Sequence, residues 1–217
     1  MLLFETTHLF FDQYAFKLNI NNSCATIFRG KDFRHARKKL DKLQADADAK
    51  RPLLLFPGTY RDQTVSLEAF ENAKKLYQIF NNTEVDYKLR IEKPTISIYS
   101  NNDAWLEDIA STLKVEGEMW RPNDAYVDIL DDHVLLVSNN NGHQYRCTLG
   151  QNAKNNCNWL INNQDKVKIG PVLKKAIRTG LNVEGLYFYV RDEKILQLIS
   201  LCGINLRRVD RLVVKQN

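Results

Sequence analysis

The 217-residue chain has few of the residues that interrupt regular structure, with only nine glycines and five prolines. Linkers and disordered chains are rich in these residues, so their scarcity favours compact elements joined by short connections. The apolar share of 44% and the charged share of 26% are ordinary for a globular protein. We therefore expect a folded chain that buries a substantial core.

The chain also lacks a long apolar run. No stretch approaches the roughly 18 apolar residues that a membrane-spanning helix requires. The segment 1–16 is apolar, but it has no basic start of the kind a signal peptide shows, and Glu5 and His8 interrupt it. We expect a protein without a membrane partner that lies in the cytoplasm, or in a host cytoplasm if the chain is viral.

Cysteine is present only four times, and no two cysteines form a CxxC pair. The closest pair, Cys147 and Cys157, has no histidine at the spacing of a zinc finger. This usage is typical of reduced, buried cysteines in an intracellular protein. The sequence therefore predicts no structural metal and no other cofactor.

Motifs of the common enzyme classes are missing as well. The chain has no GxGxxG, GxSxG or HExxH pattern, and Arg29-Gly30-Lys31 lacks the spacing of a phosphate-binding loop. These absences favour a protein that is not an enzyme. An RNP-like motif of RNA-binding sheets is also absent.

One weak catalytic signal remains. His133 and His143 lie near Asp131, Asp132 and Asn141 in the sequence. Side chains of these types can hold a divalent ion that activates water. A metal-dependent nuclease is therefore kept as the last of three functional hypotheses.

The N-terminal half has the pattern of three successive units, each with two strands and a helix. Alternating apolar residues predict the strands, and apolar residues three and four positions apart predict the helices. Asp32, Ser66 and either Asn102 or Asp103 stand where a helix N-cap is expected. The expected elements are strands 14–20 and 24–28 with a helix to residue 47, strands 53–56 and 61–65 with a helix to residue 80, and strands 85–91 and 95–99 with a helix to residue 113.

The C-terminal half is less regular. Asp192 is the expected N-cap of its last helix, and Gly180 is the expected end of the helix before it. Charge on both faces of the final strand indicates an edge strand. The expected elements are an edge strand at 119–120, a hairpin of strands 134–137 and 145–149, helices at 153–161 and 171–179, a strand at 186–190, a helix at 193–201 and a strand at 205–214.

Two internal similarities accompany this pattern. Lys17 to Ile20 matches Lys88 to Ile91 at an offset of 71 residues, and Ile98-Tyr99 matches Phe188-Tyr189 at an offset of 90. Either duplication or chance recurrence of strand, turn and helix explains them. The sequence thus predicts an α+β fold of repeated ββα units, with a largely antiparallel sheet, helices on one face and a possible internal pseudo-duplication. We expect two halves, 1–117 and 118–217, which one continuous domain would also accommodate.

The net charge of +5 weakly favours a polyanionic partner. Basic side chains gather in two places, on the first long helix and near the C-terminus, where phosphates could bind. The alternative is that these are ordinary solvated faces. The candidate nucleic-acid-binding residues are Arg29, Lys31, Arg34, Arg37, Lys38, Lys174, Lys175, Arg178, Arg207, Arg208 and Arg211.

Tyrosines on predicted strands are the second candidate feature. Tyr87, Tyr99, Tyr187 and Tyr189 could stack on bases, as aromatic side chains do on RNA-binding sheets. The alternative is that they pack in the core. Because Phe188 and Tyr189 fall on opposite faces of one strand, at least one of them is expected to be buried.

Three hypotheses follow. The first is a non-enzymatic accessory protein that binds DNA or RNA through basic helix faces. The second is a protein-interaction or assembly module, of viral or phage type, that acts through an exposed sheet face or edge or by self-association. The third is the nuclease described above.

Overall fold

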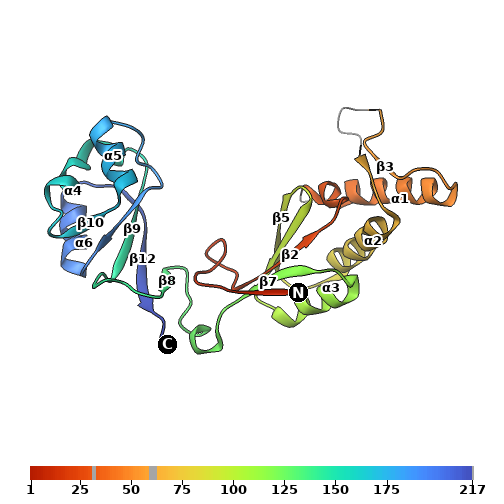
Figure 1. Ribbon diagram of the computed structural model, residues 1–217, viewed down its shortest axis with the longest axis horizontal. Helices are drawn as coiled ribbons and strands as arrows, with labels where there is room; N and C mark the ends of the chain where they lie inside the picture. The colour runs from red at the N-terminus through yellow and green to blue at the C-terminus, as the bar shows by residue number, and fades with distance from the viewer. Residues whose placement is uncertain (31–32, 59–62, 217) are drawn as a thin grey trace. The chain divides into compact units, whose positions relative to one another are not determined.

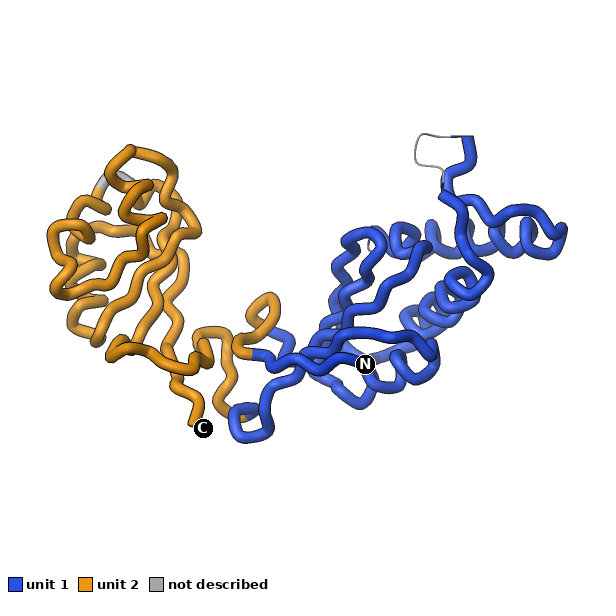
Figure 2. The backbone as a smooth tube through the Cα atoms, in the orientation of Figure 1, with its two compact units in different colours: residues 1–6, 13–127 blue, residues 7–12, 128–217 orange. Residues whose placement is uncertain are grey.

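The computed structural model describes residues 1–30, 33–58 and 63–216, except for the side chains of residues 154 and 155. The chain forms two compact units (Figure 2). Unit 1 contains residues 1–6 and 13–127, and unit 2 contains residues 7–12 and 128–217. The segment 7–12 therefore leaves the first unit to join the second before the chain returns.

Unit 1 contains a five-stranded sheet in the order β1-β7-β2-β6-β5. The strands β1 and β7 are parallel, and every other neighbouring pair is antiparallel. The alternation of β2 places Leu18 and Ile20 in the core and turns Lys17 and Asn19 to the other face. The strands are β1 (Leu2–Glu5), β2 (Phe16–Asn21), β5 (Tyr87–Glu92), β6 (Thr95–Ser100) and β7 (Gly117–Arg121).

The helices of unit 1 cover one face of this sheet (Figure 1). Their apolar stripes, represented by Leu40, Phe70 and Ile109, pack on Ile96 and Ile98 of β6. A two-stranded sheet of β3 (Leu54–Leu55) and β4 (Gln63–Thr64) accompanies them. The helices are the 3-10 helix η1 (Ala25–Phe28), α1 (Arg34–Asp48), α2 (Leu67–Asn82) and α3 (Asp103–Leu113), and a further 3-10 turn, η2, spans Asp124–Tyr126.

Unit 2 contains a second five-stranded sheet in the order β10-β11-β9-β12-β8. The strands β8 and β12 are parallel, and the other neighbouring pairs are antiparallel. The core of this unit shares no buried residue with the core of unit 1. The strands are β8 (Val134–Val137), β9 (Tyr145–Leu149), β10 (Val167–Ile169), β11 (Tyr187–Val190) and β12 (Leu206–Val214).

The helices of unit 2 also lie on one face of their sheet (Figure 1). Leu160, Leu173 and Ile199 each come from a different helix and pack in one cluster with Cys147 and Phe188 of the sheet. Burial raises the pKa of the Cys147 thiol to about 12, so this cysteine behaves as a small apolar residue. The helices are η3 (Ala153–Asn156), α4 (Asn158–Asn162), α5 (Pro171–Thr179) and α6 (Glu193–Leu201).

The two sheets have the same connectivity. When the strands of each unit are numbered along the chain, both sheets run in the order 1-5-2-4-3, with strands 1 and 5 parallel and the remaining neighbours antiparallel. Strands 2 to 5 have the order of a split βαβ fold, and strand 1 is added at one edge. The 90-residue offset joins equivalent positions, because β6 and α3 correspond to β11 and α6.

The prediction of an α+β fold with largely antiparallel sheets is confirmed, but the repeated ββα unit is not. The expected return strand 24–28 is the 3-10 helix η1, and β2 pairs instead with β6 and β7. The 71-residue offset therefore does not relate two hairpins. Shared connectivity is a property of topology, and duplication of the sequence stays a prediction.

Three further expectations about strands are wrong. The strands at 134–137 and 145–149 form no hairpin, because β12 lies between them. Accordingly, β12 is not an edge strand, and β7 lies between β1 and β2. The hairpin was expected because the two strands are close in sequence, and β12 was expected at an edge because both of its faces carry charge. In each sheet, however, the strand that arrives last along the chain is inserted between two earlier strands.

The predicted ends of helices agree with the structure more closely than the predicted strand pairing does. The side chains of Ser66, Asn102 and Asp192 each accept a hydrogen bond from the backbone N–H three residues later. Gly180 ends α5 in the left-handed conformation, with a φ of 69°. The expected cap Asp32, and the first two residues of the expected strand 61–65, lie outside the described residues.

Within the described part of the chain, no helix is both long enough and apolar enough to span a bilayer. Three of the four cysteines are buried, Cys202 is half-buried, and all four are free thiols.

Candidate nucleic-acid interface

The face of the unit 2 sheet opposite its helices carries two aromatic rings. Strand alternation places Phe188 and Val190 in the core and directs Tyr187 and Tyr189 to the uncovered side. Tyr187 is 48% exposed, and its ring centroid lies 5.6 Å from that of Tyr189 at an interplanar angle of 78°. The sequence Tyr-Phe-Tyr-Val therefore follows the alternation of β11, whose apolar Phe and Val side chains face the core and whose two Tyr side chains face the other side of the sheet.

The neighbouring strands add cations to these rings. Register places Lys168 of β10 and Arg146 of β9 on either side of Tyr189, while Thr148 lies beside Tyr187. The Arg146 guanidinium stands 5.5 Å from the Tyr187 ring centroid, which is cation–π distance. We call the surface made by Tyr187, Tyr189, Arg146, Thr148 and Lys168 the tyrosine face.

A buried ion cluster anchors one side of this face. The Arg146 Nε and Nη2 atoms donate to Asp210 Oδ2 at 3.0 and 2.7 Å, and Asp210 is fully buried. Arg208 donates to the other oxygen of Asp210, and also to Asp12 and to the Asp132 carbonyl. Arg208 thus fastens the segment 7–12 to the rest of unit 2. Because Arg146 and Arg208 are both paired with the Asp210 carboxylate, Lys168 is the cation of the tyrosine face that we assign to phosphate.

The charge excess of the protein lies mainly in unit 2. This unit has thirteen lysines and arginines against nine aspartates and glutamates, whereas unit 1 has eighteen against seventeen. Of the net charge of +5, therefore, +4 belongs to the unit that carries the tyrosine face. Such an excess attracts a polyanion over a distance of about one Debye length, roughly 8 Å at physiological salt.

Two hollows adjoin the tyrosine face. A cavity of about 110 Å³ lies beside Tyr189 and includes Lys168 and Leu212 in its lining. A second, of about 290 Å³, lies by β10 and is lined by Lys166, Lys168 and Arg191 among others. A chain of phosphates that leaves the tyrosines in this direction meets three basic side chains and one carboxylate, that of Asp165.

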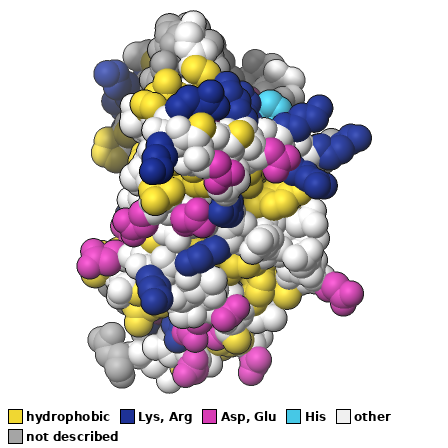
Figure 3. Space-filling model, turned by 90° about the vertical axis from the view of Figure 1, so that its right-hand side faces the viewer, with side chains coloured by type: hydrophobic (Ala, Val, Ile, Leu, Met, Phe, Trp, Pro, Cys, Tyr) yellow, Lys and Arg dark blue, Asp and Glu magenta, His cyan; other side chains and the backbone are white. Residues whose placement is uncertain are grey.

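The basic residues predicted from the sequence fall in three places. Arg34, Arg37 and Lys38 are exposed on α1, and Arg29 is exposed at the end of η1. Figure 3 shows Lys and Arg side chains gathered in the upper part of the face that carries α1, with Asp and Glu side chains below. Arg37 approaches Asp41 at 3.9 Å, which offsets part of this charge. Lys31 lies outside the described residues.

The C-terminal group divides between the two layers of unit 2. Lys174, Lys175 and Arg178 belong to α5 in the helix layer, where the Lys174 ammonium donates to Gln164 Oε1 at 3.0 Å. Arg207 and Arg211 are exposed on β12. The predicted set therefore does not form one continuous site, and sequence reasoning did not include Arg146 and Lys168. Both stand at outward positions of alternating strands, which is the signal that could have found them.

The four strand tyrosines also separate. Tyr87 is half-buried and packs against the core of unit 1, with ring centroids 5.3 Å from Phe80 and 5.4 Å from Trp105, and Tyr99 is only 4% exposed. Only Tyr187 and Tyr189 belong to the tyrosine face. Burial, together with the neighbouring Tyr187, raises the pKa of Tyr189, so its hydroxyl stays neutral near pH 7.

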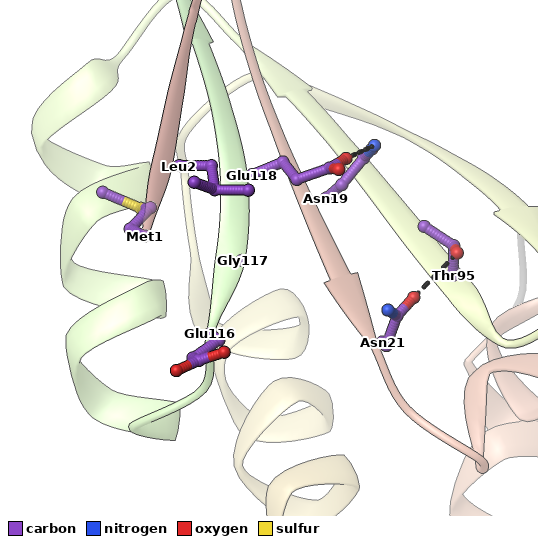
Figure 4. Close-up of a pocket in the computed structure, with 8 residues that line it drawn as sticks. All are labelled: Met1, Leu2, Asn19, Asn21, Thr95, Glu116, Gly117 and Glu118. Atoms are coloured by element: carbon purple, nitrogen blue, oxygen red, sulfur yellow. Dashed lines mark hydrogen bonds between the residues drawn. The ribbon is translucent and has the colours of Figure 1, made fainter.

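Unit 1 has a larger hollow, of about 510 Å³, on the uncovered face of its own sheet (Figure 4). The carboxylate of Glu118 turns toward Asn19, whose Nδ2 donates to it at 3.1 Å, and Thr95 donates to Asn21 at 2.8 Å. Glu116 adds a second carboxylate to the lining. This negative lining repels phosphate, so we do not place the nucleic-acid interface there.

The residues of the nuclease hypothesis do not form a metal site. His133 is exposed and pairs with Asp132 at 3.5 Å, whereas His143 is buried and packs on Tyr189 with ring centroids 6.1 Å apart. In residues 1–30, 33–58 and 63–216, no group of three or more His, Cys, Asp or Glu side chains is arranged to hold a metal ion.

Comparisons of the chain with protein-family profiles, with curated proteins and with solved structures find no match, so the tyrosine face is the candidate interface on its own geometry and chemistry.

Proposed function

We propose that the protein binds single-stranded nucleic acid, without catalysis, through the tyrosine face of unit 2. The observation that carries this proposal is the pair Tyr187 and Tyr189 on the side of the sheet opposite the helices, where Tyr189 lies between Arg146 and Lys168. Sheet-surface aromatics of this kind stack on bases, while a neighbouring cation, here Lys168, holds a phosphate.

The geometry favours a single strand over a duplex. In a double helix the faces of the bases are already stacked on one another, so rings on a sheet cannot reach them. An unpaired strand offers both its bases and its backbone, and each stacked base contributes about 1–3 kcal/mol. The basic helix α1 stays a predicted secondary contact for phosphates.

The proposal is tested by fluorescence anisotropy with labelled strands of about twelve nucleotides, DNA and RNA in parallel, and with duplexes of the same length. We expect single strands to bind more tightly than duplexes, and affinity to fall steeply between about 50 and 200 mM salt. The difference between DNA and RNA shows whether the sugar is recognised.

Substitutions of Tyr187 distinguish affinity that comes from base stacking from affinity that comes from the positive charge of the protein. Tyr187→Ala is expected to weaken binding about 5- to 150-fold, because one stacked base is lost. Tyr187→Phe keeps the ring and is expected to retain most of the affinity. An equal loss in both variants would show that the hydroxyl, not the ring, makes the contact.

The cation is tested by a matched pair of substitutions. Lys168→Glu reverses a charge on the tyrosine face, whereas Lys194→Glu makes the same change on the exposed surface of α6 in the helix layer. We expect the first to weaken binding more and to lower the slope of log affinity against log salt by about one or more. If the two variants behave alike, the tyrosine face is not the interface.

A second function is supported by the edge strand β1. Met1, Leu2, Leu3 and Phe4 are between 41% and 64% exposed, and among the described strands β1 pairs with β7 alone. An apolar strand edge of this kind can accept an extended segment of another protein or of a second copy. Sedimentation over a range of concentrations tests the second case, in which Leu3→Lys is expected to lower the associated fraction.

A further inference from the structure

The cavity beside Tyr189 is formed by the turn between β8 and β9. This turn, residues 138–142, closes against the end of the tyrosine face, and its left-handed residues Asn141 and Gly142, with φ of 48° and 75°, allow the reversal. The cavity, of about 110 Å³, includes Asn139, Asn140, His143, Lys168 and Tyr189 in its lining.

Hydrogen bonds within the turn use the side-chain amide oxygens of Asn139 and Asn140 and leave the amide nitrogens to bind a ligand. Asn139 Oδ1 accepts from the Asn141 N–H at 2.7 Å, and Asn140 Oδ1 accepts from the Gly142 N–H at 3.1 Å. Because a backbone N–H can only donate, these amide oxygens are identified, and the amide nitrogens remain as donors. With the ammonium of Lys168, the lining is rich in donors.

His143 holds this lining against the stacking platform. The side chain is 8% exposed, its Nδ1 donates to the Asn140 carbonyl at 3.3 Å, and its ring lies 6.1 Å from that of Tyr189. The turn is thus tied to the ring on which a base would stack, which makes the cavity a preorganised continuation of the tyrosine face.

We propose that this cavity receives the edge of a nucleobase, and that its donors select bases that present carbonyl oxygens over bases that present amino groups. The inference rests on the proposed function and adds base selectivity to it. At the C4 position uracil offers the acceptor O4 where cytosine offers an amino donor, and the adjacent N3 is a donor in uracil and an acceptor in cytosine. Both pyrimidines stack on tyrosine, so a difference in affinity between uracil and cytosine reports the contribution of the cavity and not that of stacking on Tyr187 and Tyr189.

The test is binding of oligouridylate and oligocytidylate of about twelve nucleotides, at one salt concentration, to the full chain. We expect uridylate to bind at least about fivefold more tightly, the lower end of the discrimination that one well-placed hydrogen-bonding contact gives. Asn139→Asp keeps the oxygen that the turn needs and replaces the donor with an acceptor. It is expected to bring the ratio of the two affinities close to one.

A charge-matched control is available in the same unit. Asn182 Oδ1 accepts from the Glu184 N–H at 3.0 Å in a similar turn away from the cavity. Asn182→Asp adds the same charge and is expected to leave the ratio unchanged. Circular dichroism of both variants verifies that the fold is retained.

The outcomes separate this inference from the proposed function. A ratio near one in the unaltered protein, with binding that Tyr187→Ala still weakens, overturns the cavity inference and leaves the stacking platform in place. Loss of the ratio in both aspartate variants also overturns it. If the protein binds neither oligouridylate nor oligocytidylate, both proposals are overturned.

Discussion

At the scale of single residues, the most consequential group is Asp210. Its carboxylate is fully buried and accepts hydrogen bonds from Arg146 and Arg208, two guanidiniums with side chains 27% and 24% exposed. Arg146 belongs to the tyrosine face and Arg208 fastens the segment 7–12, so one carboxylate positions both. A buried charge of this kind is tolerated because both of its oxygens are occupied by charged donors.

We predict that Asp210→Asn destabilises the protein by about 3 kcal/mol, because it removes the counter-ion of Arg146 and one of the two carboxylates that pair with Arg208. Urea unfolding followed by circular dichroism measures the change. Glu92→Gln is the control, since Glu92 pairs with Arg90 in an exposed ion pair that is worth about 0–1 kcal/mol. Equal effects of the two substitutions would contradict the role given to Asp210.

At the scale of elements, equivalent helices of the two units begin in the same way. Asn102 caps α3 by accepting from the Trp105 N–H at 2.9 Å, and Asp192 caps α6 by accepting from the Ile195 N–H at 3.1 Å. Each helix connects the strand beside the centre of its sheet to the strand that arrives last. The caps therefore define where each final crossover starts.

We predict that Asn102→Ala and Asp192→Ala each lower the free energy of unfolding by about 1 kcal/mol. Each substitution removes the side-chain acceptor of a backbone N–H that has no hydrogen-bond partner within the helix. Thermal unfolding measures both losses. Lys194→Ala, in the first turn of α6 but outside the cap, is expected to change stability by less than about 0.5 kcal/mol. A loss in the lysine variant as large as in the cap variants would refute the assignment.

These elements show what could be predicted locally. The caps Ser66, Asn102 and Asp192 were correct because a cap depends on a side chain and a backbone group only three residues apart. The strand 24–28 was wrong because its apolar residues satisfy a 3-10 helix, η1, as well as a strand. The prediction of a hairpin between β8 and β9 was wrong because strand pairing depends on all strands of the sheet, and β12 inserts between these two.

At the scale of the whole molecule, the chain builds two cores. Ile109 of α3 and Ile199 of α6 are both fully buried and occupy equivalent positions, but each lies in the core of its own unit. The two clusters have no buried residue in common. Each sheet is covered by helices on one side, and in unit 2 the segment 7–12 contacts the opposite face through the pair of Asp12 with Arg208.

We predict that Ile199→Ala and Ile109→Ala have separable effects. Each deletes buried methyl groups at a cost of about 2–5 kcal/mol. In amide hydrogen exchange, Ile199→Ala is expected to lower protection chiefly in β9, β11 and β12, and Ile109→Ala chiefly in β2 and β6. An equal loss of protection across both sheets in either variant would contradict two separate cores.

The sequence by itself determined the fold class, the helix caps and the two faces of β11, since alternation alone separates Phe188 from Tyr189. Only the tertiary structure decided which tyrosines are accessible. The half-buried Tyr87 ring packs on Phe80 of α2 and Trp105 of α3, whereas Tyr187 stands on the side of its sheet opposite the helices. Periodicity depends on neighbours a few residues away, while strand order, register and the cations beside Tyr189 depend on contacts between distant segments, whose free energy no local pattern contains.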